Sequence, residues 1–509
     1  MIDTTALREK VLDLAIRGKL VPQDPNDEPA SVLLERIREQ KKQMVKEGKL
    51  KAKDIKDDSI IYKEDNCYYE NIDGKIKDIT EEIPFDLPNN WSWCRLNLIC
   101  PYGDCEKVEC KNILENDWIL ELEDIEKDSG KIISFITKKE RPSVSLKHKF
   151  YKGQLLYSKL RPYLNKVVIA PQKGFCTSEI LPLSFYEEIN PLYMQMFLMS
   201  KTFLNYVDLI SYGVKMPRLG TNDGKQALIA LPPLNEQKRI SNKFLEIIPI
   251  LERIKFNQTT LLEDKELLKS KILEFAIQGK LVPQDENDEP ASVLLERIRA
   301  ERKAQLGKKY VESYIYKGDD NCYYEKVGEK TVNITRFIPY NIPQNWAWSR
   351  LENVADIVTG ATPNKNNQLY YGGNFPFYKP NDLEQNRHVL ISSEKLSQEG
   401  INIVRKVPAN SIGVCCIGSI GKCGFFEKEG ATNQQINTII PYIDNVFMYY
   451  ICSSNLFKNQ LLEKASATTI AIVNKNKMLS IFVAIPPINE QRQIANLIEK
   501  IFVLLKDES

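Results

Sequence analysis

A glycine-rich segment, GSIGKCG at Gly418–Gly424, comes nearest to a known catalytic spacing. A phosphate-binding P-loop needs a glycine five residues before its GK pair and Ser or Thr directly after it. Those two positions hold Cys416 and Cys423. We therefore interpret the segment as a glycine-rich turn, and we keep its Lys422 as a cation that can reach a phosphate.

Cysteine and histidine do not form a recognisable metal or nucleophile site. Four cysteines lie between residues 94 and 110, but their spacings are wider than those of common zinc sites and no histidine accompanies them. The chain has only 2 histidines, His148 and His388, which argues against a histidine-based triad. His148 lies in KHKF and is expected to face solvent or a phosphate. The sequence predicts no catalytic residue and no metal site.

Two clusters in the first half of the chain combine cationic, aromatic and amide side chains, as nucleic-acid contacts require. Cations on phosphates give affinity and position, whereas Arg, Asn and Gln at base edges discriminate sequence. A solvated strand edge is the alternative explanation for the same composition. The candidate residues are Lys159, Arg161, Tyr163, Asn165 and Lys166, followed by Lys215, Arg218 and Asn222.

The second half of the chain has a weaker charge signal and a stronger amide signal. The segment ATNQQINT, Ala431–Thr438, groups four amide side chains, and amides can bond adenine through two atoms. Turn capping and strand-edge hydrogen bonding explain such amides equally well. The candidate residues are Thr362, Lys365, Lys422, Asn433, Gln434, Gln435, Asn437, Lys475 and Lys477.

Charge is unevenly distributed although the 509-residue chain carries only +2 overall. Residues 102–128 contain ten acidic and three basic residues, a net −7, whereas residues 129–225 contain six acidic and fifteen basic, a net +9. This imbalance predicts a basic face on the first variable region. No apolar run approaches the roughly 20 residues needed to cross a bilayer. The 11 cysteines, without a CxxC pair or a signal segment, favour the reducing cytoplasm.

The sequence repeats itself almost exactly over one stretch and more loosely over others. AIRGKLVPQDPNDEPASVLLERIR recurs 261 residues later with only two differences, Arg17/Gln278 and Pro25/Glu286. The regions between the repeated blocks, residues 97–231 and 352–485, resemble each other far less. The repeated pairs are Ala15–Arg38 with Ala276–Arg299, Asp65–Glu70 with Asp320–Glu325, Trp91–Leu96 with Trp346–Leu351, and Pro232–Ile240 with Pro486–Ile494.

The repeated blocks are expected to form long helices. From Ile240 to Phe275, apolar residues step alternately by four and three, as a coiled-coil seam requires. Pro249 should kink or split this helix, and Gly279 should end it. A second helix is expected from about Glu289 to Leu306. The expected spacer contacts are Ile240, Phe244, Ile247, Leu251, Leu268 and Ile272, with Leu7, Val11, Leu14, Ile494, Ile498 and Ile501 from half-helices at the two ends of the chain.

The variable regions are expected to be mixed and rich in strands. Gly153–Pro171 and Asn410–Glu427 are short runs of β-branched, aromatic and small residues broken by Gly, Pro and Asn. One helix is expected at Leu192–Leu204 and its counterpart at Val446–Leu462. The predicted domains are scaffold helices at 1–60, a first domain with its leading segment at 61–231, central spacer helices at 232–308, a second domain at 309–485 and a half-helix at 486–509.

These blocks, in this order and present twice, resemble the specificity subunits of type I restriction-modification systems. The resemblance rests on GKLVPQDPNDEPASVLLERIR and its copy, on PNNWSWCRL and PQNWAWSRL, on the two PP(L/I)NEQ blocks, and on SKLRPYLNK and ATNQQIN. It implies two β-rich target recognition domains whose separation is set by an antiparallel pair of long helices, in an α+β fold. The register of the half-helices at the two ends, which repeats the opening and the close of the seam at offsets of 254 and 261, predicts coiled-coil helices in a pseudo-twofold circular arrangement.

The resemblance also implies a function and partners. Each recognition domain would read one half of an asymmetric bipartite site in double-stranded DNA. The helices would set the spacing and dock two modification subunits, which use S-adenosylmethionine. Restriction subunits would use ATP and Mg. This chain itself would be non-catalytic, cytoplasmic, without cofactor and without membrane contact.

Two other functions remain open from the residues alone. The chain could be a helical-spine adaptor that binds protein partners through its two β-rich domains, or a nuclease built on scattered carboxylates. DNA binding should weaken steeply with salt through counterion release, whereas an apolar protein interface should not. A nuclease would cut DNA without any partner, in the presence of metal alone.

Overall fold

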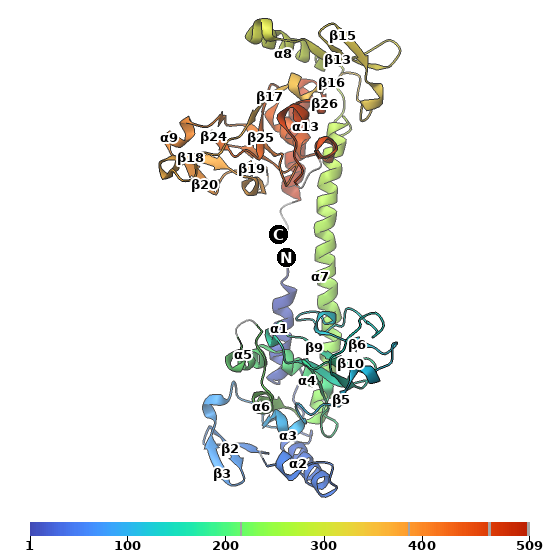
Figure 1. The fold of residues 1–509 in the computed structure, drawn as a ribbon, viewed down its shortest axis with the longest axis vertical. Helices are drawn as coiled ribbons and strands as arrows, with labels where there is room; N and C mark the ends of the chain where they lie inside the picture. Colours follow the sequence, from blue (N-terminus) through green and yellow to red (C-terminus); the bar gives the residue numbers. More distant parts are fainter. Residues whose placement is uncertain (57, 214–215, 385–386, 467–469, 506–509) are drawn as a thin grey trace. The chain divides into compact units, whose positions relative to one another are not determined.

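The computed structural model divides the chain into two compact units, Ile2–Gln258 and Thr259–Ser509 with Met1 (Figure 1). It describes residues 1–56, 58–213, 216–384, 387–466 and 470–505. The division falls within the helix α7 (Leu234–Ile277). Among the described residues, no helix is both long and apolar enough to span a membrane.

The amino-terminal unit builds three small sheets and one strand pair around a helical frame. Its sheets have the strand orders β1-β2-β3, β5-β7-β10-β6 and β11-β8-β9, and β12 pairs with β4. Its α-helices and strands are α1 (Thr4–Ile16), α2 (Ala30–Lys46), β1 (Ile60–Glu64), β2 (Cys67–Ile72), β3 (Lys75–Asp78), β4 (Ser92–Arg95), α3 (Leu96–Ile99), β5 (Lys107–Val108), β6 (Ile119–Leu120), β7 (Lys147–Phe150), β8 (Leu155–Ser158), β9 (Val167–Ile169), β10 (Gly174–Thr177), β11 (Ile180–Leu183), α4 (Pro191–Met199), α5 (Lys201–Ile210), α6 (Thr221–Lys225), β12 (Leu228–Leu231) and the first part of α7.

The carboxyl-terminal unit follows the same plan with larger sheets. Their orders are β13-β14-β15, β17-β25-β22-β23-β19 and β20-β18-β24-β21, and β16 pairs with β26. Its elements after α7 are α8 (Ala291–Leu306), β13 (Ser313–Lys317), β14 (Tyr323–Val327), β15 (Lys330–Asn333), β16 (Ala347–Arg350), β17 (Ala355–Thr359), β18 (Tyr371–Tyr378), β19 (His388–Val389), β20 (Glu394–Leu396), α9 (Gln398–Asn402), β21 (Lys406–Val407), β22 (Ser411–Cys415), β23 (Cys423–Phe426), β24 (Gly430–Thr432), β25 (Ile436–Pro441), α10 (Asn445–Ser453), α11 (Asn455–Lys464), α12 (Lys475–Leu479), β26 (Phe482–Ile485) and α13 (Ile488–Leu504).

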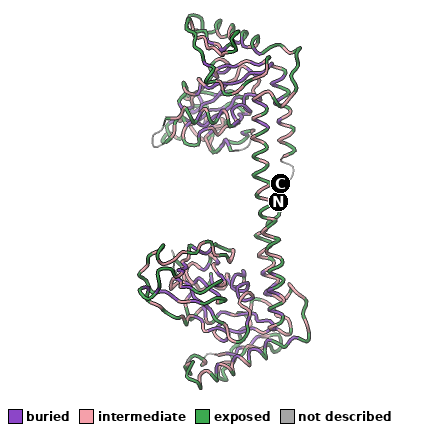
Figure 2. Tube along the Cα trace, turned by 90° about the vertical axis from the view of Figure 1, so that its right-hand side faces the viewer, coloured by how far each residue is buried: buried purple, intermediate pink, exposed green. Residues whose placement is uncertain are grey.

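Each unit has its own hydrophobic core, and the burial colours show purple segments in the interior of each unit (Figure 2). In both, the strand that opens the recognition domain pairs antiparallel with the strand that closes it, Trp93 opposite Ala230 and Trp348 opposite Ala484. The two mixed, strand-containing domains that the sequence predicts are therefore present. They share this plan although their sequences have diverged.

The repeated blocks meet in each unit at one buried carboxylate. In the amino-terminal unit, Glu236 accepts hydrogen bonds from the Trp91 indole N–H at 2.9 Å and from the Gln23 amide at 2.5 Å. The second copy forms the same contacts: Glu490 accepts from Trp346 at 2.9 Å and from Gln284 at 2.6 Å. Burial raises the pKa of both carboxyls.

A glycine in each first block allows that contact to form. Gly18 has φ +65°, and a Cβ there would lie 2.6 Å from Cγ of Pro88. Gly279 has φ +71° and the same relation to Pro343, at 2.4 Å. Only glycine combines a left-handed backbone with so close an approach. Gly279 also lies just beyond the end of α7, as predicted, because its left-handed backbone does not continue the helix. Its N–H donates to the Ala276 carbonyl at 3.3 Å.

Three helix predictions need correction. Pro249 does not split α7, which remains one helix from Leu234 to Ile277; the residue is exposed, and so is Leu245, whose carbonyl loses its partner. The predicted helix at Leu192–Leu204 is two helices, because the Ser200 hydroxyl caps α5 by accepting from the Phe203 N–H at 3.3 Å. The predicted helix at Val446–Leu462 breaks in the same way, where Ser454 caps α11.

The predicted spacer residues belong largely to the cores of their own units. Ile240 and Phe244 are buried in the amino-terminal core, and Val11 packs against it. Ile272, Ile494 and Ile498 lie together in the carboxyl-terminal core, and Ile501 packs against it. Leu14, Ile247 and Leu251 are partly buried, and Leu7 and Leu268 are exposed. A continuous helix–helix seam stays a prediction.

A buried ion pair fixes the leading three-stranded sheet of each unit to its recognition domain. Arg95 binds Glu70 through two atoms, at 2.9 and 2.7 Å, and also donates to the Gln226 carbonyl at 2.8 Å. Arg350 repeats this arrangement with Glu325, both bonds measuring 2.8 Å. The Arg95 pair is more buried, with side chains 7% and 5% exposed against 16% and 14%.

Arg95→Ala is expected to destabilise the amino-terminal unit by about 3–5 kcal/mol, because it leaves the Glu70 carboxylate buried without its partner. Arg350→Ala should cost the carboxyl-terminal unit less, since water screens that pair more. Denaturant titration followed by hydrogen–deuterium exchange would assign each loss to its unit. The control Lys63→Ala removes an exposed partner of Asp86 and should cost little, because water screens an exposed pair; a loss equal to that of Arg95→Ala would contradict this role of burial.

Candidate nucleic-acid interface

The two predicted cation clusters of the first domain lie side by side. The loop between β8 and β9 contacts the segment before α6 through a bridge between Leu160 and Arg218. The Arg161 N–H donates to the Pro217 carbonyl at 2.8 Å, and the Leu219 N–H donates to the Lys159 carbonyl at 3.0 Å. Backbone hydrogen bonds thus hold residues that are more than fifty positions apart in sequence on one surface.

Side chains that are at least partly exposed on this surface include those of Lys159, Arg161, Tyr163 and Asn222. Arg161 has φ +47°, and its Nε is buried without a hydrogen-bond partner among the described residues, although the residue as a whole is partly exposed. Tyr163 is 45% exposed, Lys159 is partly exposed and Asn222 is exposed on α6. A cation, an aromatic ring and an amide in one place are the groups that contact phosphates and bases.

The other first-domain candidates have internal partners. Asn165 is buried and donates to the Met199 carbonyl at 3.1 Å, so its expected DNA contact is corrected to a structural one. Lys166 donates to the Leu122 carbonyl at 2.6 Å, and burial lowers its pKa. Arg218 pairs with Glu179 at 3.2 Å. Lys215 lies outside the described residues.

The second domain brings its candidate loops together through equivalent bonds. The Cys416 N–H donates to the Gln435 carbonyl at 2.7 Å, and the Val473 N–H donates to the Cys416 carbonyl at 2.9 Å. Ile417 bridges Ile472, just as Leu160 bridges Arg218 in the first domain. The predicted glycine-rich turn lies here between β22 and β23, with Gly418 and Gly421 at φ +78° and +86°.

Among the four candidate amides of residues 431–438, Gln434 alone is exposed, and it accepts a hydrogen bond from the Thr362 hydroxyl. Gln435, partly exposed, accepts from the Asn433 amide at 2.9 Å. Asn437 is 3% exposed and accepts from Thr359 at 2.8 Å. For the two buried amides, Asn433 and Asn437, the expected base contact is therefore corrected to a structural one.

The cations of the second domain remain accessible. Lys365 and Lys475 are exposed, and Lys477 is partly exposed on α12. Lys422 is partly exposed and pairs with Glu384.

Two residues of these surfaces, and the backbone role of the predicted Gln435, escaped prediction from the sequence. Lys458 comes from α11, and its side chain lies against Gly421. Glu179 and Gln435 hold equivalent loops in the two domains through their backbone carbonyls, which accept from Lys159 and Cys416. Every residue type has a backbone carbonyl, so the residue type does not reveal which carbonyl accepts a hydrogen bond. Only the offset between the repeats could have located these two acceptors.

The charge imbalance of the first domain is partly neutralised by folding. Cations of residues 129–225 pair with carboxylates of residues 102–128. The net +9 of residues 129–225 therefore does not by itself produce a uniformly basic face. The pairs are Lys138–Glu115 at 2.8 Å, Arg141–Asp124 at 2.5 Å, Lys147–Glu121 at 2.5 Å and Lys149–Glu106 at 2.9 Å.

His148 is buried, which corrects the expectation that it faces solvent or phosphate. It is 5% exposed in β7, and its Nδ1 lies 2.9 Å from the Ile180 carbonyl, to which it donates. Burial lowers its pKa. Cys94 and Cys100 are buried in the same unit, and burial raises the pKa of the Cys94 thiol to about 12. Among the described residues, no group of His, Cys, Asp and Glu side chains is arranged to hold a metal ion.

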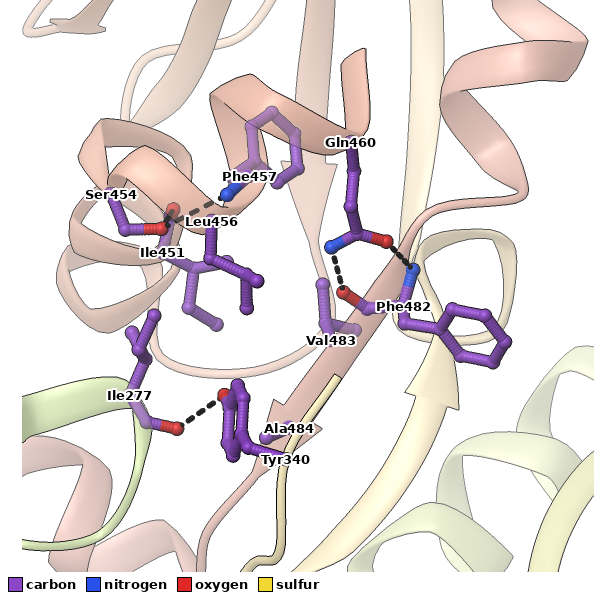
Figure 3. A pocket seen from close by; sticks show the side chains of 10 residues that line it. All are labelled: Ile277, Tyr340, Ile451, Ser454, Leu456, Phe457, Gln460, Phe482, Val483 and Ala484. Carbon is purple, nitrogen blue, oxygen red and sulfur yellow. Dashed lines mark hydrogen bonds between the residues drawn. The ribbon is translucent and has the colours of Figure 1, made fainter. Parts of the chain in front are cut away.

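A small hollow in the carboxyl-terminal unit does not have the features of a ligand site (Figure 3). Its Gln460 side chain donates to the Phe482 carbonyl at 3.0 Å and accepts from the Phe482 N–H at 2.9 Å. The Tyr340 hydroxyl donates to the Ile277 carbonyl at 2.6 Å. Because these polar groups bond one another, the hollow offers a ligand little beyond apolar surface.

Comparison with known proteins shows similarity to one group of DNA specificity subunits. Residues 343–506 match the family model described as the type I restriction modification DNA specificity domain. The EcoAI specificity subunit of Escherichia coli is 28% identical, over 70% of this chain and 63% of that subunit, which is less than two thirds of its length. The EcoEI specificity subunit, also of Escherichia coli, is 25% identical, over 97% and 88%. The chain is thus similar to specificity subunits of type I restriction-modification systems, and residues 343–506 carry the matching domain.

A solved structure supports the fold. It is described as "Structural basis underlying complex assembly and conformational transition of the type I R-M system" and superposes with a TM-score of 0.58. The match covers 83% of this chain and 92% of that one at 19% sequence identity, which is evidence for the fold alone.

The buried His148 predicts a pH dependence for the first unit. Its folded pKa is lowered, so the folded state binds the proton less readily than the unfolded chain does. This contribution to stability is complete above the unfolded pKa of about 6.5 and is lost as the pH falls through the folded pKa. Urea titrations between pH 7 and pH 5 should show a shallower loss in His148→Gln than in the unaltered chain; equal slopes would contradict the assignment.

Proposed function

We propose that this chain is the DNA-recognition subunit of a type I restriction-modification complex, and that each unit reads one half of a bipartite site. The observation that carries the proposal is that the two domains hold equivalent loops by equivalent backbone bonds and present different side chains there. Arg161 in the first domain corresponds to Gly418 in the second, and Glu179 corresponds to Gln435. Two recognition domains that differ in their loop side chains, on one repeated frame, are expected to bind an asymmetric DNA site.

The division of labour on each surface follows from the chemistry of its groups. Lys159 and Arg161 in the first domain, and Lys365 and Lys475 in the second, would neutralise phosphates and set the position of the domain on DNA. Gln434 would read a base edge, because a glutamine amide both donates and accepts and suits adenine in the major groove. Its contact with Thr362 restrains the side chain before DNA arrives.

The helices are proposed to set the distance between half-sites. At 1.5 Å per residue, the 44 residues of α7 form a rod of about 66 Å. The matching seam registers at the two ends of the chain support a second, antiparallel spacer assembled from α1 and α13, which gives the pseudo-twofold circular arrangement. A dimer-like frame of this kind fixes half-site spacing geometrically.

Catalysis is proposed to reside in the partners. Two modification subunits would transfer methyl groups from S-adenosylmethionine, and restriction subunits would use ATP and Mg to move along and cut DNA. The present chain would supply sequence recognition and a docking frame, without a cofactor of its own. We propose that the chain performs this recognition in the cytoplasm, together with its DNA target.

Gln434→Ala should relax the target at one base pair of one half-site, by about 1–3 kcal/mol of discrimination. Arg161→Ala should instead weaken binding and reduce its salt dependence, because a phosphate or base contact of the other domain is lost. Binding to a randomised duplex pool at several salt concentrations measures both effects. Gln305→Ala, exposed on α8 outside the recognition domains, is the control. An unchanged profile for Gln434→Ala would remove it from the reading surface.

The function itself is tested by co-expression with the neighbouring modification subunit in a host that lacks DNA methylation. Mapping of modified adenines should reveal one motif with two defined halves and a fixed gap. Exchange of residues 97–231 for the equivalent region of a relative should change one half only. A change in both halves would refute separate reading, and no methylation from a soluble, associated complex would refute the proposed function.

A further inference from the structure

Two backbone positions that correspond in the recognition domains hold a different pair of side chains in each. Glu179 and Gln435 each accept a hydrogen bond, through the main-chain carbonyl, from the first residue after β8 or β22, at 3.0 and 2.7 Å. Arg218 and Ile472 each form a bridge to the second residue after the same strand. An ion pair in the first domain is therefore replaced by an amide and an apolar side chain in the second.

The ion pair of the first domain is accessible and loosely held. The side chains of Arg218 and Glu179 are 40% and 23% exposed, and their two N···O distances are 3.2 and 3.3 Å. The buried pair of Arg95 and Glu70 is tighter, at 2.9 and 2.7 Å. Exposed ion pairs contribute little to stability because water screens them. Stability therefore does not explain why a guanidinium and a carboxylate stand at these two positions.

Glu179 leaves one edge of the Arg218 guanidinium open. Its two carboxylate oxygens accept from Nε and Nη2, which form the side edge of the guanidinium. Among the described residues, none bonds Nη1. The end edge, formed by Nη1 and Nη2, keeps two parallel donors, and the carboxylate restrains the orientation of their plane. Arg218 is thus a bidentate donor that is oriented before a ligand arrives.

A phosphate is a poor ligand for this pair. The Glu179 carboxylate offsets the charge of the Arg218 guanidinium and repels a second anion placed beside it. The unpaired charges of a phosphate contact are better supplied by Lys159 and Arg161 on the same surface. A ligand that fits the pair must offer acceptors to the guanidinium and, next to them, a donor to the carboxylate.

The major-groove edge of one kind of base pair has this order of groups. A G·C pair presents two acceptors, N7 and O6 of guanine, followed by a donor, N4 of cytosine. An A·T pair presents an acceptor, a donor, a second acceptor and then the thymine methyl group. On an A·T pair the carboxylate would face the O4 acceptor of thymine, and the two would repel each other. Glu179 and Arg218 together therefore suit a G·C pair and oppose an A·T pair.

The corresponding side chains of the second domain suit the other kind of base pair. The Gln435 amide has a donor and an acceptor, which match N7 and N6 of adenine, and Ile472 is 38% exposed and offers apolar contact to a thymine methyl. Asn433 donates to the Gln435 amide oxygen at 2.9 Å and restrains it. Each domain thus has one restrained polar group and one neighbour that together complement a single base pair.

We propose that Glu179 and Arg218 read a G·C base pair in the half-site of the first domain, and that Gln435 and Ile472 read an A·T pair at the corresponding place in the other half-site. Arg218 bonds guanine through its end edge, while Glu179 orients Arg218 and accepts from N4 of cytosine. The inference rests on the proposed function, which supplies the DNA, and it names the base pair that each domain selects there.

The test exchanges the two pairs in the full chain, co-purified with the modification subunit and bound to a randomised duplex pool. Glu179→Gln with Arg218→Ile should change one G·C position of the first half-site to A·T. Gln435→Glu with Ile472→Arg should change one A·T position of the other half-site to G·C. The preference at the altered position should shift about tenfold or more, and all other positions should stay as they are. Exchange of residues 97–231 identifies which half-site belongs to the first domain.

The matched control is Glu109→Gln with Lys111→Ile, which removes an exposed ion pair of the same domain and should leave every position unchanged. A first half-site without a G·C pair, or an unchanged preference in the first variant, would overturn the inference. Equal loss at all positions would also overturn it, because a purely structural role predicts that result. If the first variant fails to fold, the reciprocal variant decides, and an A·T position that it retains overturns the inference. Failure of the unaltered complex to select any bipartite motif would refute the proposed function instead.

Discussion

A buried carboxylate in the first turn of α7, and its copy in α13, joins three stretches of chain that are far apart in sequence. Glu236 receives the Trp91 indole at the opening of the recognition domain and the Gln23 amide of the loop before α2. The domain closes immediately before this helix, at β12. The carboxylate therefore fixes where a recognition domain leaves the frame and where it returns, and the tight turn at Gly18 is needed for the blocks to approach. The recognition loops that differ between the units lie outside this contact.

The recognition surfaces depend on backbone more than on side chains for their shape. The bonds that hold the loops together run between main-chain groups, from Lys159 to Leu219 in one unit and from Cys416 to Val473 in the other. Main-chain bonds do not depend on residue type, so the loop side chains are free to change without loss of the loop conformation. This explains how an arginine at position 161 and a glycine at position 418 occupy corresponding places.

The sequence predicted those features that depend on neighbouring residues. The end of α7 at Gly279 and the turn at Gly418–Gly424 follow from local backbone chemistry, and both are confirmed. The breaks at Ser200 and Ser454 were missed because the apolar runs continue past them, although a capping serine is a local signal. Other errors came from partners that are distant in sequence. His148 donates to a carbonyl 32 positions away, and Asn437 accepts from a side chain 78 positions away. A single sequence does not reveal such pairings, and the offset between the repeats was the one long-range signal available.

The antiparallel pairing of β4 with β12, and of β16 with β26, has a consequence for how such genes change. Each domain begins and ends on two neighbouring strands, so its two connections to the frame lie side by side. Near-identical protein segments precede the two domains. Recombination between the gene regions that encode them would exchange or delete a whole variable domain and leave both junctions inside an intact frame. New target sequences could then arise by shuffling complete domains, without a series of destabilising point mutations.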